Sequence, residues 1–480
     1  MIGREKEQKM LLEAYKSNEP SLVAVYGRRR IGKTYLVSQT FSDKFAFFHS
    51  GVSPDEMENL SNSEKLAMQI KAFRNTLILS GYRDCPVFDN WQDAFLQLEL
   101  YLESIKAEGK RVVFIDEIPW MDTEGSHFIT AFESYWNTYA CRRPNILTII
   151  CGSATSWMIN KLFRNKRGLY GRATREILLL PFTLKETEDY LLSHHINMSR
   201  YDIVRTYMSL GGVPYYLNYF EAGKTVSENI DACFFQGSKP LKDEYDSLFR
   251  AIFENPVKTE AIVRALGKKN IGLSRSEILS STGFSDGGAF SSALKALEKS
   301  DFILPYSPLN HEGKELYYKL IDPFCLFYLK HIENAPSLNP SFWQGHTNSD
   351  SIRAYRGFAF ENVCFHHIPQ IKKALGVEKI ASSQYPYLQR GGENRVGSQI
   401  DLVIFRADNI VNLCEMKFYS DDYEQNEKDH KDLERKVKSL VERLPKKASV
   451  HPVLVTTFGL IKRGYYSDFE YVITLDDLFQ

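Results

Sequence analysis

Three short runs of apolar residues interrupt the first part of the chain: SLVAVY at 21–26, RVVFI at 111–115 and ILTIIC at 146–151. Runs that lack polar alternation are typical of strands buried on both faces, as in a parallel sheet. A polar stretch with a helical pattern, from about 56 to 109, separates the first two runs. The pattern therefore predicts that residues 1–180 form an α/β domain built on a parallel sheet.

The middle of the chain changes to a mostly helical pattern. Residues 181–245 are expected to be helical, with a break at the Gly-Gly-Val-Pro sequence of positions 211–214. Within residues 246–335 the pattern gives a helix, a turn, a second helix at 289–300, and two strands joined by a polar loop. This order is typical of a winged helix, which either contacts DNA through its second helix or serves packing between domains.

The last part of the chain returns to a mixed pattern. Residues 336–350 are rich in Asn, Ser and Pro and are expected to form a linker. Residues 351–480 begin with a helix, and a charged helix is predicted at about 423–444. Strands are predicted near 399–405, 411–419 and 450–457. We therefore expect a second α/β domain at this end.

Composition narrows the class of protein. The 480 residues are 43% hydrophobic and 25% charged, a globular profile with room for two to four domains. Lys+Arg and Asp+Glu both number 60, which argues against a histone-like polycation but leaves a local DNA-binding face open. The polar first residues and the lack of a bilayer-length apolar run predict no signal peptide and no membrane partner. Seven scattered cysteines without a C-x-x-C spacing favour reduced thiols and a cytoplasmic location.

A phosphate-binding motif follows the first apolar run. The sequence GRRRIGKT at 27–34 matches G-x-x-x-x-G-K-[ST] and lies between a predicted strand and a predicted helix. Gly27 and Gly32 allow the backbone to wrap phosphates, while the helix start faces the anion. Lys33 is expected to reach the β- and γ-phosphates of ATP, and Thr34 to place its hydroxyl on Mg²⁺.

Polar residues end the second and third apolar runs. Asp116 and Glu117 follow the second run, at the sheet edge where α/β proteins bind ligands. Asp116 is expected to hold Mg²⁺, and Glu117 to orient or deprotonate the attacking water. Ser153, or Thr155 as the second choice, is the candidate contact to the γ-phosphate.

These motifs resemble those of the archaeal-type ATPases of the AAA+/STAND group. The opening sequence IGREKE at 2–7 is similar to their entry motif, and the resemblance implies that Arg4 lies near the adenine. The sequence GSATSWM at 152–158, followed by Tyr-Gly-Arg, is similar to their fourth-strand region and implies that Arg172 senses phosphate; an ion-pair role for Arg172 is the alternative. Gly-Val-Pro at 212–214 is similar to the motif of their helical lid.

A second group of charged residues lies in the last predicted domain. Asp401 lies within one apolar strand, and Glu415 and Lys417 lie on one side of the next. If the two strands form a hairpin centred on Asp408, Asp401 falls opposite Glu415, Val403 opposite Leu413, and Phe405 opposite Val411. Two carboxylates this close repel each other unless a cation joins them, and Mg²⁺ is the expected occupant.

This D…E-x-K pattern resembles the PD-(D/E)xK nuclease superfamily. The resemblance implies that Asp401 and Glu415 bind the metal and that Lys417 stabilises charge during phosphodiester cleavage. Glu361, in the helix that opens residues 351–480, is similar to the helical acid of that superfamily. Isoleucine stands where the superfamily often has proline before the first aspartate.

The whole pattern predicts a P-loop ATPase core at 1–180, a helical lid at 181–245, a winged helix at 246–335, a linker at 336–350 and a restriction-endonuclease-like domain at 351–480. We expect an ATP- and Mg²⁺-dependent ATPase coupled to a nuclease-like domain that acts on or senses DNA. The alternative is a STAND-type signalling ATPase whose nuclease fold is catalytically silent, and a third is a DNA-binding regulator. The sequence leaves the oligomeric state open.

Overall fold

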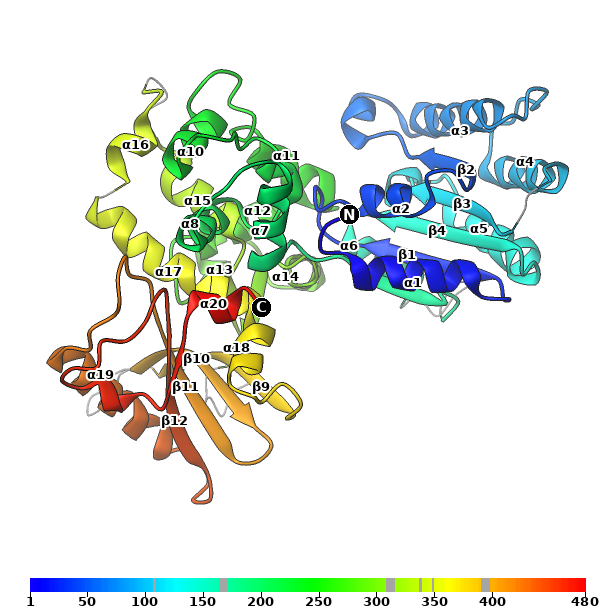
Figure 1. Ribbon diagram of the computed structural model, residues 1–480. Helices are drawn as coiled ribbons and strands as arrows, with labels where there is room; N and C mark the ends of the chain where they lie inside the picture. The colour runs from blue at the N-terminus through cyan, green and yellow to red at the C-terminus, as the bar shows by residue number, and fades with distance from the viewer. Residues whose placement is uncertain (107–108, 164–170, 308–315, 336–338, 348, 390–397) are drawn as a thin grey trace. The chain divides into compact units, whose positions relative to one another are not determined.

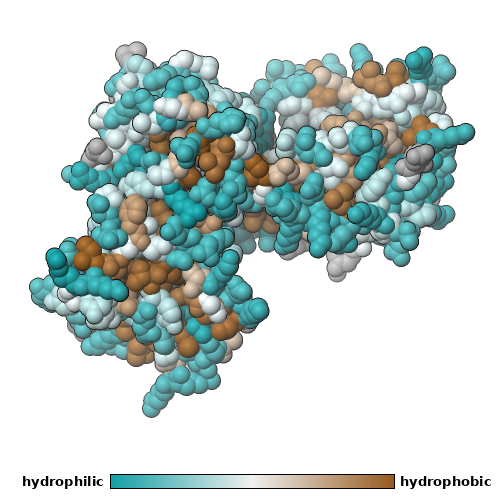
Figure 2. Space-filling view, viewed as in Figure 1, coloured by the Kyte–Doolittle hydropathy of each residue, from teal (hydrophilic) through white to brown (hydrophobic). Residues whose placement is uncertain are grey.

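The computed structural model describes residues 1–106, 109–163, 171–307, 316–335, 339–347, 349–389 and 398–480. Contacts within the chain divide it into two compact units. Unit 1 comprises Met1–Pro181 and Asp246–Pro256, and unit 2 comprises Phe182–Tyr245 and Val257–Gln480. Hydrophilic residues cover most of the face drawn in Figure 2, and hydrophobic residues form smaller separate patches on it.

Unit 1 is built on a five-stranded parallel sheet in the order β2-β3-β4-β1-β5 (Figure 1). The α/β fold with a parallel sheet is therefore confirmed, and the three predicted strands form its centre. The strands are β1 (Ser21–Tyr26), β2 (Phe45–Ser50), β3 (Arg111–Asp116), β4 (Ile146–Gly152) and β5 (Arg175–Leu178).

Helices cover both faces of this sheet, because successive side chains of each strand point to opposite sides. Leu22 and Ala24 pack in the core formed with α3, α4 and α5, whereas Val23 and Val25 pack in the core formed with α1 and α2. The main helices of this unit are α1 (Glu5–Lys16), α2 (Lys33–Phe41), α3 (Asn62–Leu79), α4 (Trp91–Ser104), α5 (Phe128–Ser134) and α6 (Thr155–Trp157).

Unit 2 begins with a helical region. Its helices are α7 (Leu184–Ser193), α8 (Arg200–Leu210), α9 (Pro214–Leu217) and α10 (Val226–Phe234), and α11 (Glu244–Ile252) and α12 (Pro256–Leu266) each cross a boundary between the two units. At the predicted break before Pro214, two backbone segments lie close together. Phe182 donates its N–H to the carbonyl oxygen of Gly212 at 2.6 Å. A Cβ atom on Gly212 would lie 1.9 Å from the carbonyl oxygen of Phe182, so glycine is required there.

A helix, a turn, a helix and a hairpin follow, in the predicted order. The elements are β6 (Leu273–Ser274), α13 (Arg275–Thr282), α14 (Gly288–Lys299), β7 (Ile303–Tyr306) and β8 (Tyr317–Leu320). β8 pairs antiparallel with both β6 and β7. The predicted loop residues between the two strands lie mostly outside the described residues. The short helices α15 (Pro323–Phe327) and α16 (Phe342–His346) come next.

The last region holds a second five-stranded sheet in the order β13-β12-β11-β10-β9. β9, β10 and β11 are antiparallel, and β12 and β13 continue parallel to β11. The strands are β9 (Ser382–Gln389), β10 (Ser398–Arg406), β11 (Ile410–Lys417), β12 (Ser449–Thr456) and β13 (Tyr471–Ile473). The helices are α17 (Asp350–His366), α18 (Ile368–Ala374), α19 (Glu427–Val441) and α20 (Leu475–Leu478). None of the helices in the described ranges is long and apolar enough to span a bilayer.

Candidate functional site

The phosphate-binding loop joins β1 to α2 in the conformation that its glycines permit. Gly27 and Gly32 have φ angles of 144° and 90°, which residues with a Cβ rarely adopt. A Cβ atom on Gly27 would also lie 2.2 Å from the carbonyl oxygen of Leu179. Lys33, only 5% exposed, donates from Nζ to the carbonyl oxygen of Arg28 at 2.9 Å, so its ammonium lies over the loop.

A chain of hydrogen bonds crosses the ends of the neighbouring strands. Thr34 Oγ1 donates to Asp116 Oδ2 at 2.7 Å, and Asp116 Oδ1 accepts from the N–H of Glu117 at 2.9 Å. Glu117 Oε2 accepts from both the N–H and the Oγ of Ser153, at 2.9 and 2.8 Å. Residues from α2, β3 and the end of β4 are thus brought together beside the loop, although they are far apart in the sequence.

The backbone directs these groups. Glu117 follows β3 in a left-handed conformation, with a φ of 47°, which turns the chain sharply after Asp116. Gly152 precedes Ser153, and a Cβ atom on it would lie 2.8 Å from Pro119 Cδ. Ser153 and Thr155 are both buried, but Ser153 is the one that contacts Glu117.

Arg4 and Arg172, whose roles the family resemblance implies, lie in different surroundings. Arg4 is 7% exposed, and its Nη2 donates to the carbonyl oxygens of Leu180 at 2.8 Å and Ile31 at 3.4 Å. It therefore links the start of α1 to the phosphate-binding loop and to the segment after β5. Arg172 is exposed in the turn before β5.

The second group of charged residues lies on the sheet of unit 2. β10 and β11 pair with Val403 opposite Leu413 and Phe405 opposite Val411, so the predicted hairpin register is confirmed. The pairing ends with Leu402 opposite Cys414, and Asp401 is the next residue of β10. Asp401 Oδ2 accepts from the N–H of Met416 at 2.9 Å. Glu415 is 5% exposed.

Two lysines that the sequence interpretation missed pair with the carboxylates. Lys436 of α19 donates from Nζ to both oxygens of Glu415, at 2.7 and 2.8 Å. Lys319 of β8 donates from Nζ to Glu361 Oε2 at 2.5 Å. All four of these side chains are buried. Asp401 lies close enough to Glu361 and to Glu415 to raise the pKa of each, and Lys417 lies close enough to Glu415 to lower its pKa.

Burial dominates the electrostatics of this cluster. It raises the pKa of Glu415 to about 7, with repulsion from Asp401 adding to the shift and Lys436 opposing it. Burial also raises the pKa of Glu361, where Lys319 opposes and Asp401 adds. Burial lowers the pKa of the Lys436 ammonium, but Glu415 and Asp401 more than offset this, so that its pKa is raised overall. The Glu415–Lys436 contact is therefore an ion pair mainly above about pH 7, where Glu415 is ionised.

The contacts of Glu415 bear on whether Mg²⁺ can bind at this cluster, as the sequence predicted. In the described part of the chain, no three His, Cys, Asp or Glu side chains are grouped so that they could hold a metal ion. Lys436 bonds both carboxylate oxygens of Glu415, the atoms that a metal would use. As folded, the cation that pairs with Glu415 is the ammonium of Lys436.

Comparisons with known proteins agree with the description of the phosphate-binding loop and its neighbouring strands in unit 1. Residues 1–220 match the family described as an ATPase domain predominantly from Archaea. An uncharacterized protein of Methanocaldococcus jannaschii is 25% identical over 408 residues, which are 84% of this chain and 83% of that protein.

Solved structures with some similarity were also found. The Walker-type ATPase of Pyrococcus abyssi has a TM-score of 0.48 and 19% identity over 69% of this chain and 96% of its own. The ORC2 protein of Aeropyrum pernix, in ADPNP and ADP complexes, has a TM-score of 0.38 and 13% identity over 70% of this chain and 94% of its own. Residues 1–220 are therefore similar to an ATPase domain of the archaeal type, in agreement with the loop and strand-end geometry of unit 1.

Proposed function

We propose that unit 1 binds ATP with Mg²⁺ at the phosphate-binding loop and hydrolyses it with Glu117 as the residue that activates water. The observation that carries this proposal is the chain of contacts from Thr34 through Asp116 and Glu117 to Ser153. The chain places a hydroxyl, two carboxylates and a second hydroxyl beside the start of α2, where a phosphate would lie.

Each residue has a separate task in this proposal. Lys33 exchanges the carbonyl oxygen of Arg28 for the β- and γ-phosphates. Thr34 and Asp116 present oxygen atoms 2.7 Å apart, a donor set that suits Mg²⁺, and would hold it. If Mg²⁺ were held there, it would supply positive charge to offset that of the phosphates.

Glu117 has to leave Ser153 before it can orient a water for attack on the γ-phosphate. Its carboxylate is held by two hydrogen bonds from Ser153 in the structure. When the carboxylate swings away, the hydroxyl and N–H of Ser153 become available to the γ-phosphate. The proposal therefore assigns Glu117 the general-base role and Ser153 the phosphate contact.

The direct test is an ATP-binding titration of the full chain and of Lys33→Ala. We expect Lys33→Ala to lose ATP binding, while Lys71→Ala, which removes an exposed lysine from α3 of the same unit, binds as the unchanged chain does. Tight ATP binding by Lys33→Ala would refute the site. ATP binding without any turnover in the unchanged chain would refute hydrolysis alone.

For the C-terminal region we propose a nuclease-like fold that has no metal-dependent cleavage and responds to the ATPase unit. The order α17, three antiparallel strands, α19 and a parallel strand supports the nuclease-like fold. The observation that favours the silent form is the pairing of Glu415 with Lys436 and of Glu361 with Lys319.

Cleavage of DNA is the competing possibility and is tested by incubating the full chain with plasmid and Mg²⁺ or Mn²⁺. We expect no nicking above that of a Lys417→Ala preparation. Metal-dependent nicking that disappears in Lys417→Ala, but persists when the exposed Lys431 is changed to alanine, would establish a nuclease and overturn the silent form.

DNA is also the proposed partner of the helix–turn–helix and hairpin region. Ser291, Ser292 and Lys295 form an exposed polar stripe on α14, which supports contact with a duplex. Neutralising Lys295 and Lys299 should weaken DNA binding and reduce its salt dependence by about two phosphate contacts. Unchanged affinity in a fluorescence-anisotropy titration would assign this region to packing instead.

A further inference from the structure

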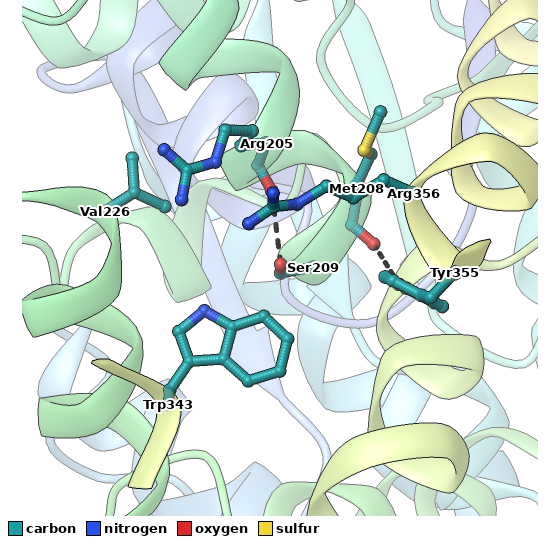
Figure 3. Close-up of a pocket in the computed structure, with 7 residues that line it drawn as sticks. All are labelled: Arg205, Met208, Ser209, Val226, Trp343, Tyr355 and Arg356. Atoms are coloured by element: carbon teal, nitrogen blue, oxygen red, sulfur yellow. Dashed lines mark hydrogen bonds between the residues drawn. The ribbon is translucent and has the colours of Figure 1, made fainter. Parts of the chain in front are cut away.

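Buried hydrogen bonds clamp separate segments of the chain together in both units. In unit 2, Tyr355 of α17 donates its hydroxyl to the carbonyl oxygen of Met208 of α8 at 2.8 Å, beside a cavity of about 10 Å³ that holds one water-sized atom (Figure 3). In unit 1, two such clamps hold the turn that follows β3. This turn begins with Glu117, the residue proposed to activate water, so its clamps bear on hydrolysis.

The backbone of this turn needs support from its surroundings. The turn runs from Glu117 to Asp122 and includes the short 3-10 helix Ile118–Met121. Glu117 has a φ of 47°, and a residue with a Cβ atom keeps this left-handed conformation only where neighbouring contacts hold it. Trp120 donates its N–H to the carbonyl oxygen of Glu117 at 2.9 Å, which closes the turn. The position of the Glu117 carboxylate therefore depends on what holds the turn in place.

The first clamp is the side-chain amide of Gln69, a fully buried residue of α3. Its Nε2 donates to the carbonyl oxygens of Trp120 and Val52, both at 2.9 Å, and its Oε1 accepts from the N–H of Val52 at 3.0 Å. The backbone on the other side is also close, since a Cβ atom on Gly51 would lie 3.0 Å from the carbonyl oxygen of Glu117. The middle of the turn is thus fixed to α3 and to the segment after β2.

The second clamp is the carboxylate of Asp122, at the end of the turn. Its Oδ2 accepts from the indole N–H of Trp157 at 3.0 Å. Trp157 is 6% exposed and belongs to α6, which begins two residues after Ser153. Lys161 Nζ also approaches Asp122, but at 4.0 Å and with half of its side chain exposed, so this ion pair adds little. The indole bond therefore ties the turn that carries Glu117 to the segment that carries Ser153.

We propose that Asp122 is a positioning residue for ATP hydrolysis and acts through its bond to Trp157. The proposed mechanism requires the carboxylate of Glu117 to leave Ser153, which breaks both hydrogen bonds between these two residues. The Asp122–Trp157 bond then keeps the two segments in register, so that Glu117 moves by rotation of its side chain while its backbone and Ser153 stay in place. A displacement of about 1 Å at the reacting groups can cost about 10²-fold in rate. This inference rests on the proposed general-base role of Glu117.

The experiment measures steady-state ATP hydrolysis by the full chain, with rate constants divided by the concentration of ATP sites found in a binding titration. We expect Asp122→Ala to lower kcat roughly tenfold or more and to change KM less than about threefold, because the phosphate-binding loop keeps its contacts. Trp157→Phe, which removes the indole N–H and keeps an aromatic ring, should lower kcat similarly. The double variant should be little worse than either single variant, since both changes remove the same bond.

Two control variants separate positioning from a general loss of structure. Asp122→Asn keeps a side-chain oxygen that can accept from the indole N–H and should recover most of kcat. Lys161→Ala removes the other partner of Asp122 and should change kcat less than about twofold. If Asp122→Ala yields no ATP sites at all, the milder Trp157→Phe decides the question.

The outcomes separate this role from its alternatives. Full kcat in Asp122→Ala and Trp157→Phe, in a chain whose turnover Glu117→Gln strongly reduces, overturns the positioning role and leaves the proposed hydrolysis intact. Equal losses of kcat in Asp122→Asn and Asp122→Ala also overturn it, because the bond to Trp157 would then not be the cause. Fewer ATP sites with an unchanged kcat at each assign Asp122 to stability alone and overturn the role. An unchanged chain that binds ATP without turnover overturns the general-base role of Glu117 and this inference together.

Discussion

Removing the ammonium group of Lys436 is the sharpest perturbation of the C-terminal cluster. In Lys436→Met the side chain keeps much of its volume, but both oxygens of Glu415 lose the donor that lies 2.7–2.8 Å away. Breaking a buried ion pair by removing one partner typically costs about 3–5 kcal/mol, because the other charge is left buried and uncompensated. We expect a loss of this size in the local stability of β11 and α19.

The loss of local stability in Lys436→Met should depend on pH. The pKa of Glu415 is raised to about 7 in the folded chain, mainly by burial, from an ordinary value of 4.5. A carboxyl group with a raised pKa favours the folded state most below its unfolded pKa, and this contribution disappears as the pH rises through 7. Without Lys436, which opposes the shift, the pKa of Glu415 rises further. Lys436→Met should therefore be much less damaging at pH 5 than at pH 8.

Hydrogen exchange measured by mass spectrometry on the full chain is the suitable assay, since a chain with two units does not have a single unfolding free energy. At pH 8, after correction for intrinsic rates, peptides from β11 and α19 should exchange roughly two to four orders of magnitude faster in Lys436→Met, the equivalent of about 3–5 kcal/mol. Adding Glu415→Gln to Lys436→Met should recover much of the protection, because the most deeply buried carboxylate that Lys436 pairs with is then neutral; Asp432, its other partner at 3.1 Å, is 38% exposed and can be solvated. Equal protection of the unchanged chain and Lys436→Met at pH 8 would refute the reasoning.

Three further predictions concern other parts of the chain. Glu117→Gln should retain ATP binding but lower the ATPase rate constant by about 10²–10⁴-fold, as measured by phosphate release, and undiminished turnover would remove Glu117 from the general-base role. Gly212→Ala places a Cβ atom 1.9 Å from a carbonyl oxygen and should destabilise unit 2 by about 1–3 kcal/mol or more, as seen in hydrogen exchange, whereas Gly345→Ala, where nothing lies within 4 Å, should not. Thr183→Ala removes the capping box of α7 and should cost about 1 kcal/mol, visible as faster exchange confined to the first turn of that helix.

The sequence predicted the parts of the fold that are written in local patterns. Central strands with continuous apolar runs were found, and so was the β10–β11 register, because the turn and the apolar pairs agree on one alignment. The edge strands β2, β5, β9 and β13 were not predicted. β2 and β5 are only partly buried, and their sequences mix polar and apolar residues. Such strands lack the continuous apolar run that marks the central strands, so they are harder to predict from sequence.

The lysines of the C-terminal cluster show what local patterns leave out. Lys436 lies between Leu433 and Leu440 on the buried side of α19, and Lys319 lies in a fully buried strand. A lysine at an apolar position is itself a signal, since lysines are almost never buried unless they are paired. The identity of the partner was hidden, because Glu361 and Lys319 lie 42 positions apart and meet only through the tertiary fold.

The two acidic sites of the chain differ in which donors bond their carboxylate oxygen atoms, and we expect this difference to affect where a metal ion can bind. At Asp116 the competing donor is the neutral hydroxyl of Thr34, which can itself become a ligand when a cation arrives. At Glu415 a cation would have to displace the ammonium of Lys436 and leave it buried beside another positive charge. The first exchange costs little, whereas the second breaks a buried ion pair and places two positive charges close together, although Lys436 keeps its contact with Asp432. Metal-dependent chemistry is therefore expected at the nucleotide site, and the C-terminal cluster is expected to act as a fixed element of unit 2.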